Sequence, residues 1–394
     1  MELNVNHPSR PRTVAALAVL SLGTFLLASV QGLVAGVLPQ LATDEGTPLA
    51  PTGTAYLLGL AVGGPLLTAA SLRLGRRLLL LLTMGAAVLV IAAMALASGT
   101  GVLLVGTVAA GALYGLFFGA SCVMAASTVP AAWLGRAVAA LLGASAAAAV
   151  LSPTLGAWTA EVLSGRLALL AIAVVGLVSL PFLWLLLPTV VVAREEGGRF
   201  RPAFTPRVLA VLGVAALLMG AQAAMVPAVV PMLGDLGELS ITQLTVILVA
   251  LVVGIVIATF AGGWAADRDA VRAMMIANAI LALTLALLFV ANAVTMLSMG
   301  MAIAIACVVV WELALRALGP SVLHSLITLA GAGRHLAAPL LLSAVSAGSV
   351  AGGEIGLRAY DLGYETAILS ALVICLAAVP LWWTVKRARA ATQA

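Results

Sequence analysis

The segment ASLRLGRRLLLLLTMG, residues 70–85, places three arginines within five positions between two long apolar runs. Over the 394-residue chain, 63% of the residues are hydrophobic and 8% are charged. Soluble domains contain about 45–50% apolar and about 25% charged residues. A water-soluble core cannot bury such an apolar excess, so the sequence indicates a membrane protein whose charge is confined to short connections like this one.

Apolar runs of membrane-spanning length recur along the chain. A hydrocarbon layer of about 30 Å is crossed by about 20 helical residues, and a helix satisfies its own backbone hydrogen bonds there. We therefore expect an all-α membrane protein with twelve transmembrane helices. The predicted spans are residues 13–41, 53–72, 78–98, 101–127, 137–160, 167–188, 208–233, 241–264, 273–292, 294–315, 321–350 and 364–385.

The loop arginines predict how the chain is oriented, because cytoplasmic loops collect Lys and Arg. With the N-terminus inside, only Arg166 and Arg358 of the loop cations fall outside, and Arg316 marks the cytoplasmic end of the tenth helix. Both termini are then cytoplasmic in a bacterial cytoplasmic membrane. The pI near 9.6 reflects this topology rather than a nucleic-acid partner.

The chain divides into two similar halves. We expect a six-helix half at residues 1–188, a cytoplasmic linker at 189–207 and a second half at 208–394. Residues 22–41 resemble residues 212–233, with a mid-helix glutamine and a proline near the outer end in each. Repeated halves with a site at their interface are typical of secondary transporters.

Several motifs resemble one family. These are GLVAGVLPQLATD (32–44), GGPLLTAASLRLGRRLLLL (63–81), LLVGTVAAGALYGLFFG (103–119) and GGWAADR (262–268). The chain resembles a twelve-helix major facilitator superfamily protein, closest to the bacterial drug:proton antiporters that include chloramphenicol-resistance and sugar-efflux exporters. The resemblance covers most of the chain and implies two six-helix halves working by alternating access.

The opening arginines match the family's cytoplasmic gate between helices two and three. The family pattern carries an aspartate where this chain has Leu72. The resemblance implies a gate built from Arg73, Gly75, Arg76 and Arg77, with Gly263, Asp267 and Arg268 as the second-half copy. Topological retention alone also explains these arginines, so both interpretations stand. In helix five, Gly143, Pro153 and Gly156 match the antiporter segment whose bend is thought to control leakage.

The charged residues usual for proton coupling in this branch are missing from the first half. Thr107 stands where helix four carries an arginine, and Val30 and Gln31 stand where helix one carries an acid. Coupling must therefore come from elsewhere or be absent.

Three ionisable residues inside predicted spans become the candidates for proton coupling, because such groups are costly in lipid. They are Glu312 in helix ten and Arg334 and His335 near the midplane of helix eleven. In one interpretation Glu312 and Arg334 form a structural ion pair that joins two helices. In the other, Glu312 carries the proton while Arg334 or His335 contacts substrate or moves the proton.

A central cavity is expected near the pseudo-symmetric glutamines, although each could instead bond a neighbouring helix. The candidate cavity residues are Gln31, Tyr114, Phe117, Phe118, Gln222 and Trp311. Glycines 111, 115 and 119 form a stripe that close helix packing explains.

The sequence argues against other functional classes. Three scattered histidines and the absence of nucleophile or phosphate-loop motifs exclude the common enzyme and ATPase patterns, and no metal or cofactor is expected beyond a proton gradient. We expect a monomeric exporter of small, largely apolar organic molecules in the lipid bilayer, driven by proton antiport. The alternatives are an uncoupled facilitator or sugar-like efflux transporter and, from another class, a non-transporting membrane sensor.

Overall fold

The computed structural model describes residues 10–45, 52–71, 74–96, 99–162, 164–187, 204–236, 241–293 and 300–382. Every regular element within these ranges is helical. The chain forms two compact units. The first comprises residues 1–202 and 331–343, and the second comprises residues 203–330 and 344–394.

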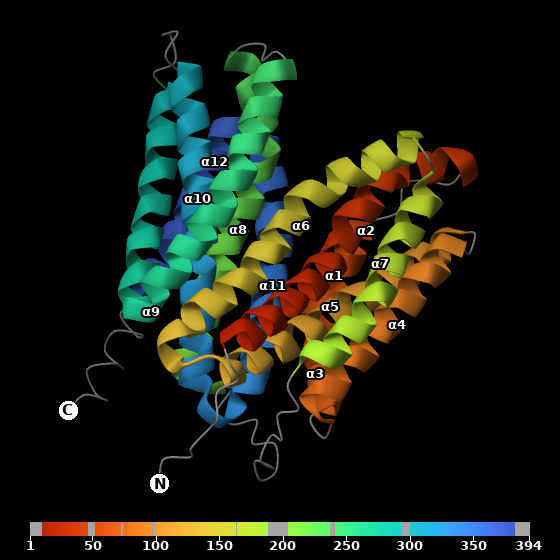
Figure 1. The fold of residues 1–394 in the computed structure, drawn as a ribbon. Helices are drawn as coiled ribbons and strands as arrows, with labels where there is room; N and C mark the ends of the chain where they lie inside the picture. Colours follow the sequence, from red (N-terminus) through yellow and green to blue (C-terminus); the bar gives the residue numbers. More distant parts are fainter. Residues whose placement is uncertain are drawn as a thin grey trace, which may run out of the picture. The chain divides into compact units, whose positions relative to one another are not determined.

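The first unit contains the helices of the N-terminal part of the chain (Figure 1). They are α1 (Arg10–Glu45), α2 (Thr52–Leu58), the π-helix η1 (Gly59–Gly63), α3 (Gly64–Ala70), α4 (Arg76–Leu96), α5 (Thr100–Thr128), the 3-10 turn η2 (Ala131–Trp133), α6 (Leu134–Val162) and α7 (Gly165–Leu186). The segment α2–η1–α3 is one continuous crossing, Thr52–Ala70.

The later helices are α8 (Pro206–Leu236), α9 (Ile241–Ala293), α10 (Gly300–Ala330), α11 (Arg334–Tyr360) and α12 (Tyr364–Ala377). A 3-10 turn, η4 (Gly331–Gly333), separates α10 from α11. Residues 334–343 of α11 belong to the first unit with η4, and the remainder of α11 belongs to the second.

Helix α9 is two membrane spans joined without a loop. The described residues contain eleven apolar helical segments of membrane length, and one of them, Ala250–Val290, has 41 residues. Within it Asp269 leaves the helical conformation (φ −156°, ψ 91°), and its Oδ1 accepts a hydrogen bond of 3.1 Å from the backbone N–H of Arg272. Such a cap starts a new helix. The predicted twelve-helix fold is thus confirmed.

Two predicted spans, 294–315 and 321–350, are wrong. The prediction broke the chain near Pro320, but α10 continues through this proline to Ala330, since proline is tolerated inside membrane helices. The break instead falls at η4, where Gly331 has a φ of +49° that glycine adopts without steric cost. Arg316 therefore lies inside α10 rather than at its cytoplasmic end.

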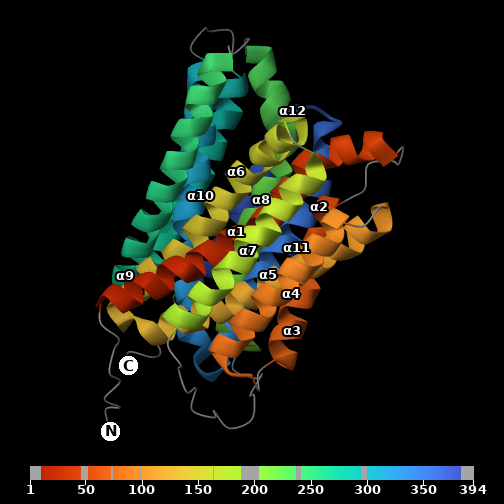
Figure 2. The same ribbon diagram turned by 45° about the vertical axis from the view of Figure 1, so that its right-hand side comes forward.

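The first helix of each unit has the same neighbours. In the first unit α1 packs against α6 and α7, its fifth and sixth crossings. In the second unit α8 packs against α11 and α12, which occupy the same places in the order of crossings. Figures 1 and 2 both show α9 and α10 running side by side within the second unit. The recurring neighbours support the internal repeat.

Glycines bring the backbones of α8 and α11 together. Gly348, Gly352 and Gly356, four residues apart, face the backbone carbonyls of Ala216, Gly220 and Ala224. A Cβ atom at any of the three glycines would lie inside van der Waals contact with the facing carbonyl oxygen. Small residues allow this close approach in membranes.

The predicted glycine stripe of α5 is also a packing surface. A Cβ on Gly111 would overlap the carbonyl oxygen of Tyr56, and a Cβ on Gly115 would lie 2.9 Å from the Cα of Gly64. In return, Gly59 of η1 faces the carbonyl of Val108. The stripe therefore seats the α2–η1–α3 crossing on α5.

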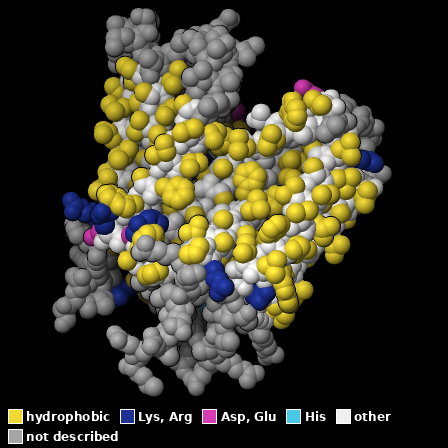
Figure 3. All heavy atoms as spheres, viewed as in Figure 1, with side chains coloured by type: hydrophobic (Ala, Val, Ile, Leu, Met, Phe, Trp, Pro, Cys, Tyr) yellow, Lys and Arg dark blue, Asp and Glu magenta, His cyan; other side chains and the backbone are white. Residues whose placement is uncertain are grey.

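The outer surfaces of the helices suit lipid. Figure 3 shows hydrophobic side chains covering most of the visible described surface. Leu89, Val105 and Leu185, each more than 70% exposed, are examples from three different helices. Polar side chains such as Thr24, Thr83 and Thr259 donate to the carbonyl four residues back, at 2.7–2.8 Å, so they need no water. These features match helices that lie in a bilayer.

We expect Gly352→Ala to destabilise the protein and Gly353→Ala not to do so. Both substitutions remove a helical glycine, but the first forces α8 and α11 apart at the carbonyl of Gly220, whereas the second meets its nearest atom, Ala223 Cβ, at 3.9 Å. Overpacking of this kind costs about 1–3 kcal/mol. Thermal unfolding of the two variants in detergent measures the difference, and equal midpoints would contradict the tight seam.

Candidate functional site

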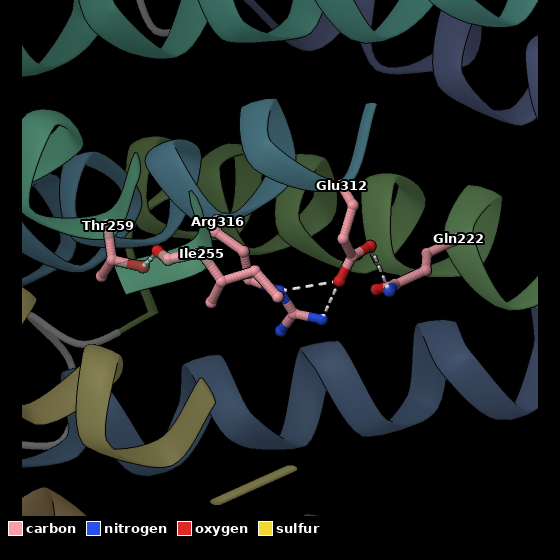
Figure 4. A network of polar contacts seen from close by, with 5 residues as sticks. All are labelled: Gln222, Ile255, Thr259, Glu312 and Arg316. Carbon is pink, nitrogen blue, oxygen red and sulfur yellow. Dashed lines mark hydrogen bonds and ion pairs between the residues drawn. The ribbon is translucent and has the colours of Figure 1, made fainter. Parts of the chain in front are cut away.

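A polar network inside the second unit joins α8 to α10 (Figure 4). The Nε2 of Gln222 on α8 donates a hydrogen bond of 3.0 Å to Oε2 of Glu312 on α10. The other carboxylate oxygen, Oε1, accepts bonds from Arg316, with Nε at 2.9 Å and Nη2 closer still. Each oxygen of Glu312 thus has its own partner.

The network combines opposite charges within one helix. Glu312 and Arg316 are four positions apart, so they lie on the same face of α10, and they form an ion pair with side chains 14% and 25% exposed. An ionisable group at this depth is costly without such a partner. The pair leaves the face neutral overall while keeping two charged groups within the span.

Gln222 has one unused hydrogen-bonding atom. Its Oε1 is buried and has no partner, while its Nε2 is engaged by Glu312. An amide oxygen can accept two hydrogen bonds. The network therefore retains an acceptor position next to the carboxylate.

The predicted partnership of Glu312 with Arg334 is wrong. Arg334 and His335 begin α11 directly after η4, instead of lying at the midplane of a helix. Ala330, which ends α10, lies 18 residues beyond Glu312, about 27 Å along a helix that rises 1.5 Å per residue. The carboxylate is held by Arg316 and Gln222 instead.

The aromatic cavity candidates of the first unit form a packed cluster on α5. The hydroxyl of Tyr114 lies 2.8 Å from Oγ of Ser145 on α6. The Tyr114 ring has its centroid 6.2 Å from that of Tyr56 and 5.9 Å from that of Phe118. Phe117 and Phe118 are fully buried, and Phe117 packs against Gly23 of α1.

The remaining cavity candidates are less enclosed or lie in the other unit. Gln31 is half-buried on α1, and Trp311 is buried on α10 beside Glu312 in sequence. Of the six cavity candidates, Gln222 is the one that the structure joins to Glu312. Thr107, at the position of the family's arginine, is fully buried and donates to the carbonyl of Leu103 at 2.6 Å.

The first-half gate candidates lie at the start of α4. Gly75 is exposed and Arg76 is buried. Arg77 reaches α7, where it donates to the carbonyl oxygen of Trp184 and lies over that ring, 4.4 Å from the centroid. Arg73 lies outside the described residues.

The second-half gate candidates lie just before the break in α9. Gly263 is buried and Asp267 is half-buried. Arg268 lies over the ring of Trp264 at 3.2 Å from the centroid. Asp267 also acts electrostatically on His324 of α10, whose Nδ1 is buried. The aspartate thus couples the end of one span to another helix of the same unit.

The helix-five candidates pack closely on α1. A Cβ on Gly156 would lie 2.7 Å from the carbonyl oxygen of Leu33, and a Cβ on Gly32 would lie 2.7 Å from Cδ of Pro153. Gly143 is buried on the same helix, α6. Small residues and a proline therefore form the seam between the first and fifth crossings, as glycines do between α8 and α11.

The family model of the Major Facilitator Superfamily matches residues 20–342. The chain belongs to this superfamily. The match agrees with the twelve crossings and the repeated helix neighbours, and it makes the protein a membrane transporter rather than an enzyme. Among the described residues, no group of three or more His, Cys, Asp or Glu side chains could hold a metal ion.

Individual relatives extend along nearly the whole transporter chain. It is 25% identical over 399 residues to the inner membrane transport protein YdhP of Escherichia coli, covering 98% of this chain and 97% of YdhP. It is 24% identical over 303 residues to the MFS-type transporter YtbD of Bacillus subtilis, covering 73% and 76% of the two chains. The human organic anion transporter MFSD10 (TETRAN) shares the fold, with a TM-score of 0.65 at 18% identity over 94% of this chain and 99% of that one.

Sequence reasoning missed the role of Arg316 in this transporter. The four-residue spacing from Glu312 predicts an intrahelical ion pair, but the misplaced helix end assigned Arg316 to the membrane surface. Ser145 and Tyr56, which complete the aromatic cluster, also went unnoticed because each is an ordinary residue in sequence. Only spatial proximity distinguishes them.

We expect Arg316→Gln to lower the free energy of unfolding more than the double variant Glu312→Gln, Arg316→Gln. Removing the arginine alone leaves a carboxylate without its counter-charge in α10, and removing one member of a buried pair costs about 3 kcal/mol or more. Replacing both leaves neutral amides. Thermal unfolding of the single and double variants completes a mutant cycle, and strictly additive effects would contradict the pair.

Proposed function

We propose that this transporter exports small, largely apolar organic molecules by proton antiport, with Glu312 as the proton-carrying group. The observation that supports this proposal is the network of Glu312 with Arg316 and Gln222 inside the second unit. A carboxylate can take up and release a proton, whereas arginine stays charged. Glu312 is therefore the member of the network that can exchange a proton.

Proton binding would change the contacts between two helices. The deprotonated carboxylate accepts from Arg316 on its own helix and from Gln222 on α8. A proton on Glu312 cancels the charge that both groups hold, so the α8–α10 contact weakens as the proton arrives. A transport cycle requires such a link between a chemical event and helix packing.

Coupling is assigned to the second unit because the first unit offers no equivalent group. Thr107 and Gln31 occupy the positions that are charged in the antiporter branch, and Thr107 is satisfied within its own helix. The substrate class, the outward direction and the antiporter branch rest on the resemblance of the motifs to drug exporters. The gate role of Arg76, Arg77 and Asp267 and a monomeric state belong to the same proposal.

A second candidate, an uncoupled facilitator, is supported by the same ion pair. Arg316 already satisfies Glu312, and a pair of this kind can serve packing alone. In that case Glu312 holds helices together and exchanges no proton.

The deciding experiment compares Glu312→Gln with the wild type in everted vesicles energised by a pH gradient, using a panel of hydrophobic drugs. We expect gradient-driven transport to fall at least about tenfold in the variant, because glutamine cannot carry the proton. Exchange of internal for external drug without a gradient should persist, since it requires substrate binding but no proton release. Gradient-driven transport at the wild-type rate in Glu312→Gln would leave the facilitator.

Glu354→Gln is the matched control. Glu354 is also paired with an arginine four positions later, Arg358, at 2.8 Å, but its side chain is 58% exposed. We expect this variant to transport like the wild type. A comparable loss in both variants would point to a general effect of removing an ion pair.

The proposed orientation, with both termini cytoplasmic, is tested by cysteine labelling in a variant that lacks the three native cysteines. The connection between α5 and α6 contains exposed Pro130, and the connection between α11 and α12 contains Leu362, which is 79% exposed. We expect a membrane-impermeant maleimide to label Leu362→Cys in intact cells and Pro130→Cys only after permeabilisation. The reverse pattern would invert the topology.

A further inference from the structure

Three arginine side chains lie flat over exposed tryptophan rings at helix ends. Arg77 lies over Trp184 at 4.4 Å, Arg136 over Trp133 at 4.2 Å and Arg268 over Trp264 at 3.2 Å. The three rings are 52–57% exposed. Each arginine also donates to a backbone carbonyl near its ring, that of Trp184, Ala132 or Trp264. The same arrangement therefore recurs in both units.

The two pairs of the first unit lie where carboxylates are absent. Arg77 begins α4 and Arg136 begins α6, and no acidic residue occurs within ten positions of either arginine or of Trp184. The acidic residues described in this unit, Asp44, Glu45 and Glu161, lie near the C-terminal ends of α1 and α6. The pair in the second unit differs, because Asp267 and Asp269 flank Arg268.

We infer that the Arg77–Trp184 and Arg136–Trp133 pairs are binding sites for the headgroups of anionic phospholipids. A guanidinium group matches the geometry of a phosphate and is the preferred side chain for recognising it. Tryptophan rings settle at the level of the headgroups, so each ring holds its arginine at the depth where lipid phosphates lie. The excess positive charge at this end favours a lipid with net negative charge over a zwitterionic one.

The Arg77 site also bridges two helices. Arg77 comes from the start of α4, whereas Trp184 lies near the end of α7, and the guanidinium contacts both the ring and the carbonyl of that residue. A phosphate on this guanidinium therefore sits where the third and sixth crossings of the first unit meet. Arg136 and Trp133 instead lie within one turn of chain at the start of α6.

The test titrates the purified full-length protein in detergent with phosphatidylglycerol or phosphatidylcholine of identical acyl chains and counts bound lipids by native mass spectrometry. We expect Arg77→Gln and Arg136→Gln each to weaken phosphatidylglycerol binding at its site about fivefold. The double variant should lose the preference over phosphatidylcholine. Arg268→Gln, the matched control with its flanking aspartates, should retain the wild-type preference.

Two results would overturn the inference. One is an unchanged phosphatidylglycerol preference in the double variant, and the other is an equal loss in Arg268→Gln, which would indicate unspecific attraction to positive charge. Soluble glycerol phosphate is added as a competitor, and displacement of the lipid by it would identify an anion site that does not require a membrane. Arg136→Gln decides the question if Arg77→Gln, which removes an α4–α7 contact, fails to fold.

Discussion

The structure depends on one constraint, which is that polar groups inside a bilayer find their partners within the protein. Helices satisfy the backbone, and threonines such as Thr24 and Thr259 satisfy their hydroxyls on the preceding turn. With hydrogen bonding closed within each helix, contact between helices depends on shape and on small residues. The glycines of α5 and α11 supply both.

The network of Glu312, Arg316 and Gln222 meets the same constraint at higher cost. Two charges within α10 neutralise each other, and an amide from α8 occupies the second carboxylate oxygen. A chain that needed only packing could fill this place with apolar side chains. The network therefore distinguishes the second unit from the first, where Thr107 is buried without charge.

Most of the fold follows from the sequence because membrane spans are decided by the length of apolar runs. The break at Asp269 follows as well, since polar residues end one run and an aspartate caps the next helix. The tenth and eleventh spans do not follow, because Pro320 is a stronger local marker than the glycine pair around Ala332 that actually ends α10. This one error displaced Arg316, Arg334 and His335 together. The candidate site was consequently recovered in part: Glu312 and Gln222 stand out as polar residues in spans, but their contact joins residues 90 positions apart.

The seam between α8 and α11 has a mechanical consequence. Where side chains interdigitate, one helix cannot slide along another until several rotamers change. At Gly348, Gly352 and Gly356 the facing surface of α8 is backbone carbonyl, and no side chain from these positions projects across the interface. The two helices are held close but not interlocked lengthwise, which suits small sliding displacements better than separation. Relative motion within this unit is thus directed along the helix axis, where the polypeptide offers the least resistance.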